Sequence, residues 1–111
     1  MMKQKNGRIF LIGSRPGLEA KSGKGMIAYS LAKSLIFRLA ELMNEEAKGT
    51  NVVTCVIVPS TIDTPQNRQS MPDADFNKWV KAEEIAQVIY SYCTPEASVI
   101  RESVIKVYNF S

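Results

Sequence analysis

The chain has 111 residues, of which 45% are hydrophobic and 23% charged, and it carries a formal net charge of +3 with no histidine. This size and composition are typical of one soluble globular domain. They exclude a disordered tail, a repeat array and, because the apolar runs are short, a bilayer-spanning segment. Without histidine, catalytic triads and dyads with a histidine base are also excluded, so acid–base chemistry must use Tyr, Lys, Asp, Glu or Cys.

The first predicted element is a buried strand over residues 8–13 (RIFLIG), a short apolar run that ends in glycine. Residues 14–25 are rich in glycine, proline and serine, which predicts a loop without a regular element. A helical period then runs over residues 26–47, and Gly49 provides the stop signal. The stripe expected to pack inward consists of Ile27, Leu31, Leu35, Leu39 and Leu42, widened by Ala28, Ala32, Ile36 and Met43.

Residues 51–58 (NVVTCVIV) predict the clearest strand, which is β-branched and lacks alternation, as strands covered on both faces do. Pro59 ends it. Residues 60–80 form a polar segment longer than a plain connection, which is typical of a substrate lid or a recognition loop. A second helix is predicted over residues 81–93 and a third strand over residues 103–108. The residues of the second helix expected to face inward are Ala82, Ile85, Ala86, Val88 and Ile89.

This order of strands and helices predicts an α/β fold with a three-stranded parallel sheet, right-handed crossovers and flanking helices. In such sheets ligands bind at the carboxyl ends of the strands. Two segments follow strand ends here, residues 13–25 and residues 59–79, and we expect the functional site to lie between them.

The cysteines and the charge distribution bear on location and partners. Cys55 lies in a predicted strand and Cys93 near a helix end, a pattern that favours two buried thiols over a disulfide or a zinc site. Together with the lack of an export signal, this predicts a cytoplasmic protein. Residues 1–38 are basic and the rest acidic, but the basic residues are scattered without interleaved aromatics, so we expect no nucleic-acid partner.

Two sequence patterns are candidates for a binding or catalytic motif. Residues 17–25 place glycine and lysine before a helix, but the spacing is one residue too long for a phosphate-binding P-loop and no Ser or Thr follows Lys24. Tyr29 and Lys33 are four residues apart on the first helix and share a face, where an ammonium group favours the ionised form of a phenol. Taken alone, this pair is better explained as an amphipathic tyrosine beside a surface lysine.

The order of these features resembles the catalytic half of the short-chain dehydrogenase/reductase family. The matching features are a strand followed by Gly13-Ser14, then Tyr29-x-x-x-Lys33, then a strand followed by Pro59-x-x-x-x-Thr64. The segment from Thr61 to Trp79 is similar to the lid of a subgroup that includes dihydropteridine reductase-like enzymes. The resemblance covers essentially the whole chain and implies a partial Rossmann-like, three-layer fold.

The resemblance implies roles for individual residues. Tyr29 would be the catalytic acid/base, Lys33 would favour its ionised form and bind the nicotinamide ribose, and Ser14 would polarise the reacting carbonyl. NAD or NADP is the implied cofactor, with Pro59, Ile62, Thr64 and Lys33 as its binding residues. Residues 65–79 would close over a small-molecule substrate. Simpler interpretations remain for Ser14, as a loop hydroxyl, and for Thr64, as a cap before Pro65.

The chain also departs from the family pattern. The loop between Ser14 and Tyr29 is slightly long, Ser60 follows Pro59 where the family has glycine, and Glu102 and Asn109 stand where glycines flank the last strand. No G-x-G-x-x-G loop occurs, and a complete family member is roughly twice as long, as its two-half fold requires. We therefore expect residues 1–111 to form one domain, the carboxyl-terminal half of such an enzyme, with Met1–Asn6 as the tail of a preceding helix.

Two functional hypotheses follow. The chain is either part of an NAD(P)-dependent oxidoreductase that needs an amino-terminal half, or a non-catalytic remnant that associates with itself or a partner. Self-association is expected because the first strand would leave an unpaired edge and because the first helix has a second apolar stripe of Ile36, Leu39 and Met43. In the family, that helix commonly lies at a dimer interface.

Overall fold

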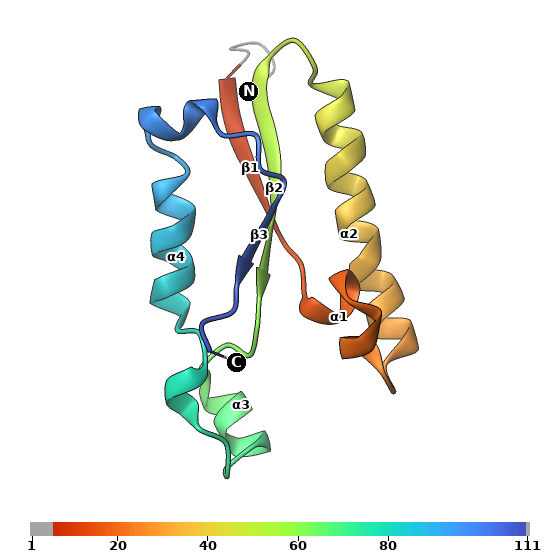
Figure 1. Ribbon diagram of the computed structural model, residues 1–111, viewed down its shortest axis with the longest axis vertical. Helices are drawn as coiled ribbons and strands as arrows, with labels where there is room; N and C mark the ends of the chain where they lie inside the picture. Colours follow the sequence, from red (N-terminus) through yellow and green to blue (C-terminus); the bar gives the residue numbers. More distant parts are fainter. Residues whose placement is uncertain (1–5, 111) are drawn as a thin grey trace.

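The computed structural model describes residues 6–110 and contains a three-stranded parallel sheet between two layers of helices (Figure 1). The strand order is β1 (Asn6–Ile12), β2 (Asn51–Pro59) and β3 (Val104–Val107). The register aligns Phe10 with Cys55 and Ile57 with Ile105. The predicted α/β fold class and its parallel sheet are therefore confirmed.

The central strand β2 is buried on both faces, and this divides the core into two clusters. Helix α4 (Ala82–Ser91) covers the face that carries Cys55 and Ile57, to which it contributes Val88 and Ile89. Helix α2 (Ile27–Glu46) covers the opposite face, which carries Val56 and Val58. Successive strand residues point to opposite faces, so an unbroken β-branched run supplies both cores at once.

The loop predicted over residues 14–25 is instead folded into two short helical turns, α1 (Arg15–Leu18) and η1 (Ala20–Gly23). The prediction was wrong because proline is compatible with the first turn of a helix, where Pro16 lies. The polar segment after β2 also contains helical turns, α3 (Pro65–Ser70) and η2 (Phe76–Lys78). A further turn, η3 (Pro95–Val99), follows α4.

The orientation of α2 differs from the prediction. The five residues of the expected inner stripe are all exposed, between 48% for Leu39 and 83% for Ile27. Ala40 is buried, and Ile36 and Phe37 pack against the sheet. Helix α2 has apolar residues on two faces. The face with Ile36, Phe37 and Ala40 packs inward, because the small Ala40 side chain allows close packing on the sheet and Phe37 lies against Gly13. The predicted outer stripe of Ile36, Leu39 and Met43 is wrong as well, since Ile36 faces the core.

The cysteines and the second predicted helix differ in part from their predictions. Cys55 is buried as predicted, but Cys93 is exposed because it follows the last turn of α4, where Tyr92 covers the sheet instead. Ala82 and Ala86 are exposed, whereas Ile85 packs inward. Met1–Lys5 of the proposed preceding helix lie outside the described residues, and Asn6 begins β1. Within residues 6–110, no helix is both long and apolar enough to cross a membrane.

Candidate functional site

The carboxyl ends of the parallel strands meet at one edge of the sheet, near α1, α3 and the chain's carboxyl terminus (Figure 1). Ser14 lies in this region directly after β1, where the neighbouring Gly13 donates its amide to the Ile57 carbonyl at 2.8 Å. Ser14 is only 9% exposed, and its hydroxyl has no hydrogen-bond partner in the described structure. An unsatisfied buried hydroxyl costs about 1–3 kcal/mol, so this oxygen is a natural position for a ligand contact.

Tyr29 and Lys33 lie on the first two turns of α2, and of the two Lys33 reaches the end of β1. The Lys33 ammonium group points to the Ile12 carbonyl, with Nζ at 3.5 Å, which is the outer limit of a hydrogen bond. Tyr29 is 50% exposed, so its phenol is open to solvent. The structure therefore brings Lys33 to the end of β1, the strand that leads into Ser14.

Gly17 is a positioning residue that the sequence analysis missed. A Cβ atom at this position would lie 2.8 Å from the backbone carbon and from the Cβ of Lys33, closer than real side chains pack. Similarly, a Cβ at Gly23 would clash with the Ser30 hydroxyl, and that hydroxyl is buried without a hydrogen-bond partner in the described part of the chain. The two glycines let α1 and η1 press against the helix that carries Tyr29 and Lys33.

We predict that Gly17→Ala destabilises the fold by about 1–3 kcal/mol, although alanine is the better helix former. The added methyl group must push α1 away from Lys33, so the Lys33 backbone resonances should shift in an NMR spectrum. Thermal unfolding measures the loss of stability. Gly25→Ala is the matched control, because Gly25 has a φ of +83° and open space around it. Gly25→Ala should lower the free energy of unfolding by a similar amount, through backbone strain, and leave the Lys33 resonances unchanged. Equal shifts of the Lys33 resonances in both variants would contradict the prediction.

The predicted cofactor residues after β2 are distributed over the end of that strand and the following turn. Pro59 is the buried last residue of β2. Ile62 pairs with Val80 in a parallel bridge, and its carbonyl accepts a hydrogen bond from the Asn67 side chain at 2.8 Å. The Thr64 hydroxyl accepts from the Asn67 amide at 3.1 Å and caps α3. The capping interpretation of Thr64 is therefore confirmed.

Residues 61–80, here called the lid, form a folded unit. Arg68 binds Asp63 with two hydrogen bonds of 2.7 and 2.9 Å and lies over the Phe76 ring at 4.5 Å. The Phe76 and Trp79 rings are 4.8 Å apart. The hydrogen bond from Arg68 lowers the pKa of Asp63 below its ordinary value of 3.8 and raises that of Arg68, so both groups stay charged near neutral pH.

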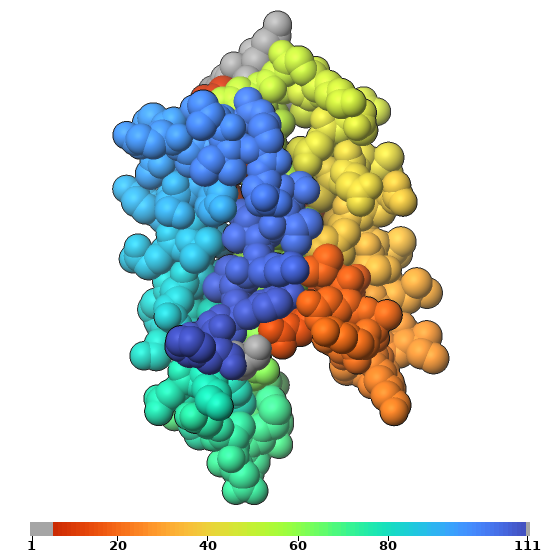
Figure 2. Space-filling model, viewed as in Figure 1, coloured from red at the N-terminus to blue at the C-terminus, as the bar shows by residue number. Residues whose placement is uncertain are grey.

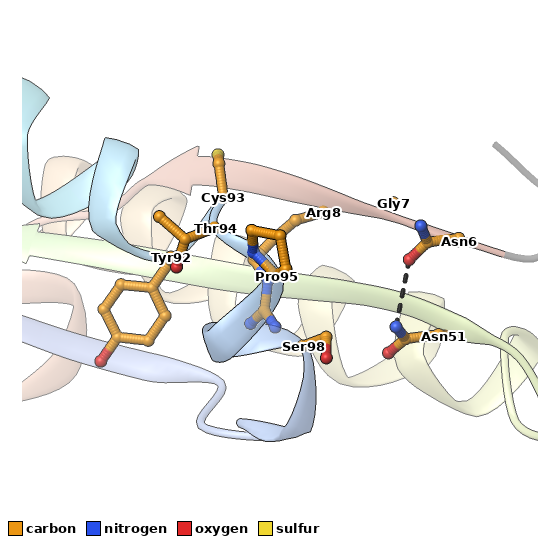
Figure 3. Close-up of a pocket in the computed structure, with 9 residues that line it drawn as sticks. All are labelled: Asn6, Gly7, Arg8, Asn51, Tyr92, Cys93, Thr94, Pro95 and Ser98. Atoms are coloured by element: carbon orange, nitrogen blue, oxygen red, sulfur yellow. Dashed lines mark hydrogen bonds between the residues drawn. The ribbon is translucent and has the colours of Figure 1, made fainter.

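A cavity of about 520 Å³ lies at the opposite end of the sheet from these residues, beside the first residues of β1 and β2 (Figure 3). The Arg8 guanidinium group in it donates to the Ala97 and Ile100 carbonyls at 3.0 and 3.1 Å, which is a structural role at the end of η3. None of the predicted site residues lines this cavity. Over residues 6–110, no group of three acidic or cysteine side chains gathers as a metal site requires.

The family model described as short chain dehydrogenase matches residues 1–75, a range that contains every predicted catalytic and cofactor residue. This chain belongs to the short-chain dehydrogenase family. The dihydropteridine reductase of Dictyostelium discoideum is 32% identical over 90 residues, which cover 79% of this chain and 38% of that protein. The 3-oxoacyl-[acyl-carrier-protein] reductase of Thermotoga maritima is 25% identical, covering 96% of this chain and 46% of that one.

Solved structures of other proteins share the fold of this short-chain dehydrogenase chain. A short chain dehydrogenase/reductase family protein superimposes with a TM-score of 0.78 at 22% identity, covering 96% of this chain and 46% of its own. A blue fluorescent protein from a metagenomic library, solved in complex with NADPH, gives 0.72 at 18% identity, with 95% and 45% covered. The chain thus spans half or less of the length of these relatives.

Proposed function

We propose that residues 1–111 form the catalytic, carboxyl-terminal half of an NAD(P)(H)-dependent short-chain oxidoreductase. Its reaction would be hydride transfer to or from a carbonyl, alcohol or imine of a small molecule. The observation that carries this proposal is the buried, unsatisfied hydroxyl of Ser14 at the strand end that Lys33 also reaches. Membership of the family supports the same assignment.

The nicotinamide cofactor would supply the hydride, and the residues present fit its reactive end. Tyr29 would give or take the proton at the substrate oxygen through its phenol. Lys33 would bind a ribose hydroxyl with its ammonium group. Ser14 would donate a hydrogen bond from its hydroxyl to the reacting carbonyl, which would give this buried hydroxyl a partner. Pro59, the Ile62 backbone and Thr64 would line the cofactor side.

The rest of the dinucleotide would need residues that this sequence lacks. No G-x-G-x-x-G loop is present to receive a pyrophosphate. Within the described residues, β1 has a hydrogen-bonded neighbour on one side, which is β2. We therefore propose that an amino-terminal half adds a strand beside β1 and supplies the pyrophosphate site.

Calorimetric titration of the isolated chain with NADH and NADPH tests this proposal. We expect weak or no binding, because Ser14, Lys33 and the lid would contact only the nicotinamide end. Adding the amino-terminal half of a related short-chain dehydrogenase as a second polypeptide should restore cofactor binding and carbonyl reduction. A low-micromolar dissociation constant for the chain alone would show that the cofactor site is complete without that half.

The alternative is a folded, non-catalytic remnant that acts by association, and the exposed apolar stripe of α2 favours it. This surface consists of Ile27, Leu31, Leu35, Leu39 and Leu42. Acidic residues cluster at the end of α2, and basic ones lie at its beginning and in the preceding turn. An antiparallel pairing of two α2 helices would bring opposite charges together and bury both stripes. We propose this homodimer under either hypothesis.

We also propose a location in the reducing cytoplasm, where Cys55 and Cys93 would stay free thiols.

A further inference from the structure

The last described residues contact three segments at the carboxyl edge of the sheet. The Arg15 guanidinium group lies over the Tyr108 ring, with its Cζ atom 3.8 Å from the ring centroid. The Tyr108 carbonyl accepts a hydrogen bond of 2.7 Å from the Ser60 hydroxyl. The Asn109 amide nitrogen donates to the Trp79 carbonyl at 3.0 Å. Figure 2 shows this dark-blue end of the chain between the orange residues that follow β1 and the teal part of the lid.

The backbone of Asn109 adds a second observation. Its φ is +53°, and it is the one non-glycine residue with a positive φ in the part of the chain that the structure describes. Glycine adopts this conformation without strain and asparagine tolerates it better than most residues. Glycine, however, has no side-chain amide. Asparagine at this position therefore combines the tight turn with a hydrogen bond to the lid.

Backbone hydrogen bonds join the two ends of the lid at its base. At its base, the Asp63 amide donates to the Val80 carbonyl at 2.7 Å, and the Val80 amide donates to the Thr61 carbonyl at 3.0 Å. Trp79 and Val80 are 5% and 1% exposed, which makes the base the most buried part of the lid. The Asn109 bond is attached at this base, so it acts on the lid as a whole.

We propose that Tyr108 and Asn109 form a latch that holds the lid in a fixed position relative to the loop carrying Ser14. Tyr108 secures that loop through Arg15, and Asn109 secures the lid through Trp79. The two are positioning residues for the site described under Proposed function, and their role in substrate binding rests on that proposal. The latch itself is a property of the isolated fold.

Hydrogen exchange of the isolated chain tests the latch through Asn109→Gly and Asn109→Asp. Both variants lose the donated bond, but only glycine relieves the positive φ. Since one hydrogen bond contributes about 1 kcal/mol, the Asp63 and Val80 amides should exchange about fivefold faster in both variants. Amides of β2 that pair with β1 should be unchanged. If either variant exchanges like the wild type at the lid base, the hydrogen bond does not hold the lid and the latch is wrong.

Tyr108→Leu tests whether the two contacts act together. It removes the ring under Arg15 and keeps an apolar side chain in the core. We expect faster exchange both in residues 15–22 and at Val80, in the lid. Tyr90→Leu is the matched control, because Tyr90 is 71% exposed on α4; it should change neither segment. Faster exchange confined to residues 15–22 would overturn the coupling.

A kinetic measurement separates the latch from the proposed function. It uses this chain together with the added amino-terminal half of a related short-chain dehydrogenase, here called the complemented protein. There, Asn109→Gly should raise the substrate KM by about fivefold and leave kcat within twofold, because the lid is displaced while Ser14, Tyr29 and Lys33 are untouched. An unchanged KM overturns the positioning role. Absence of turnover in the unmodified complemented protein would instead refute the proposed function and leave the exchange results to decide the latch.

Discussion

Replacing Tyr29 by phenylalanine should lower the turnover of the complemented protein by about 10²–10⁴-fold, the usual contribution of a positioned acid or base. The chain has no histidine and Ser14 is nearly buried, so we propose the phenol of Tyr29 as the proton donor. The substitution removes a single oxygen from a side chain that is 50% exposed. Its effect on stability should stay within about 0.5 kcal/mol, as for other surface changes.

Steady-state kinetics with a carbonyl substrate measures this loss, and thermal unfolding checks that the fold is intact. Tyr90→Phe is the matched control, since it removes the same oxygen from a tyrosine that is 71% exposed near the end of α4, the end that leads to the cavity at the opposite end of the sheet. It should retain full activity. If Tyr29→Phe keeps more than half of the wild-type turnover, another group performs the proton transfer and the assignment of Tyr29 is wrong.

Replacing Leu35 by glutamate should dissociate the proposed homodimer. Leu35 is 64% exposed and lies midway along the stripe from Ile27 to Leu42, so an antiparallel pair of helices brings the two Leu35 side chains together. Two unpaired carboxylates buried there would cost about 3–5 kcal/mol, which weakens association by more than about 100-fold. The fold of each protomer should persist, because the side chain makes no core contact within one chain.

Light scattering distinguishes the two states. The wild type should have about twice the mass of a single chain, which is 12.4 kDa, and Leu35→Glu should have the mass of one. Val99→Glu is the control, because Val99 is 80% exposed in η3, away from α2, and should leave the dimer intact. A wild-type protein of 12.4 kDa would exclude the dimer.

Much of the fold could be predicted from local patterns. The uninterrupted β-branched run of residues 51–58 indicates a strand covered on both faces, and Cys55 to Val58 are indeed 0–1% exposed. The helical periods over residues 26–47 and 81–93 place α2 and α4 to within two residues at each end. Parallel strands then bring Ser14 and Pro59 to one edge by topology alone, which located the candidate site before any contact was known.

The sequence by itself determined the order of the elements, the parallel sheet and the motif that carries Ser14, Tyr29 and Lys33, because these depend on local periodicity and spacing. Only the tertiary structure decided which apolar face of α2 packs inward, since both faces satisfy the same period and the choice depends on how Ala40 and Phe37 fit the sheet. The tertiary structure alone also shows that Gly17 lies against Lys33 and that Asn109 bonds to Trp79. These contacts join residues 16 and 30 positions apart, and no local pattern records which distant backbone will lie beside them.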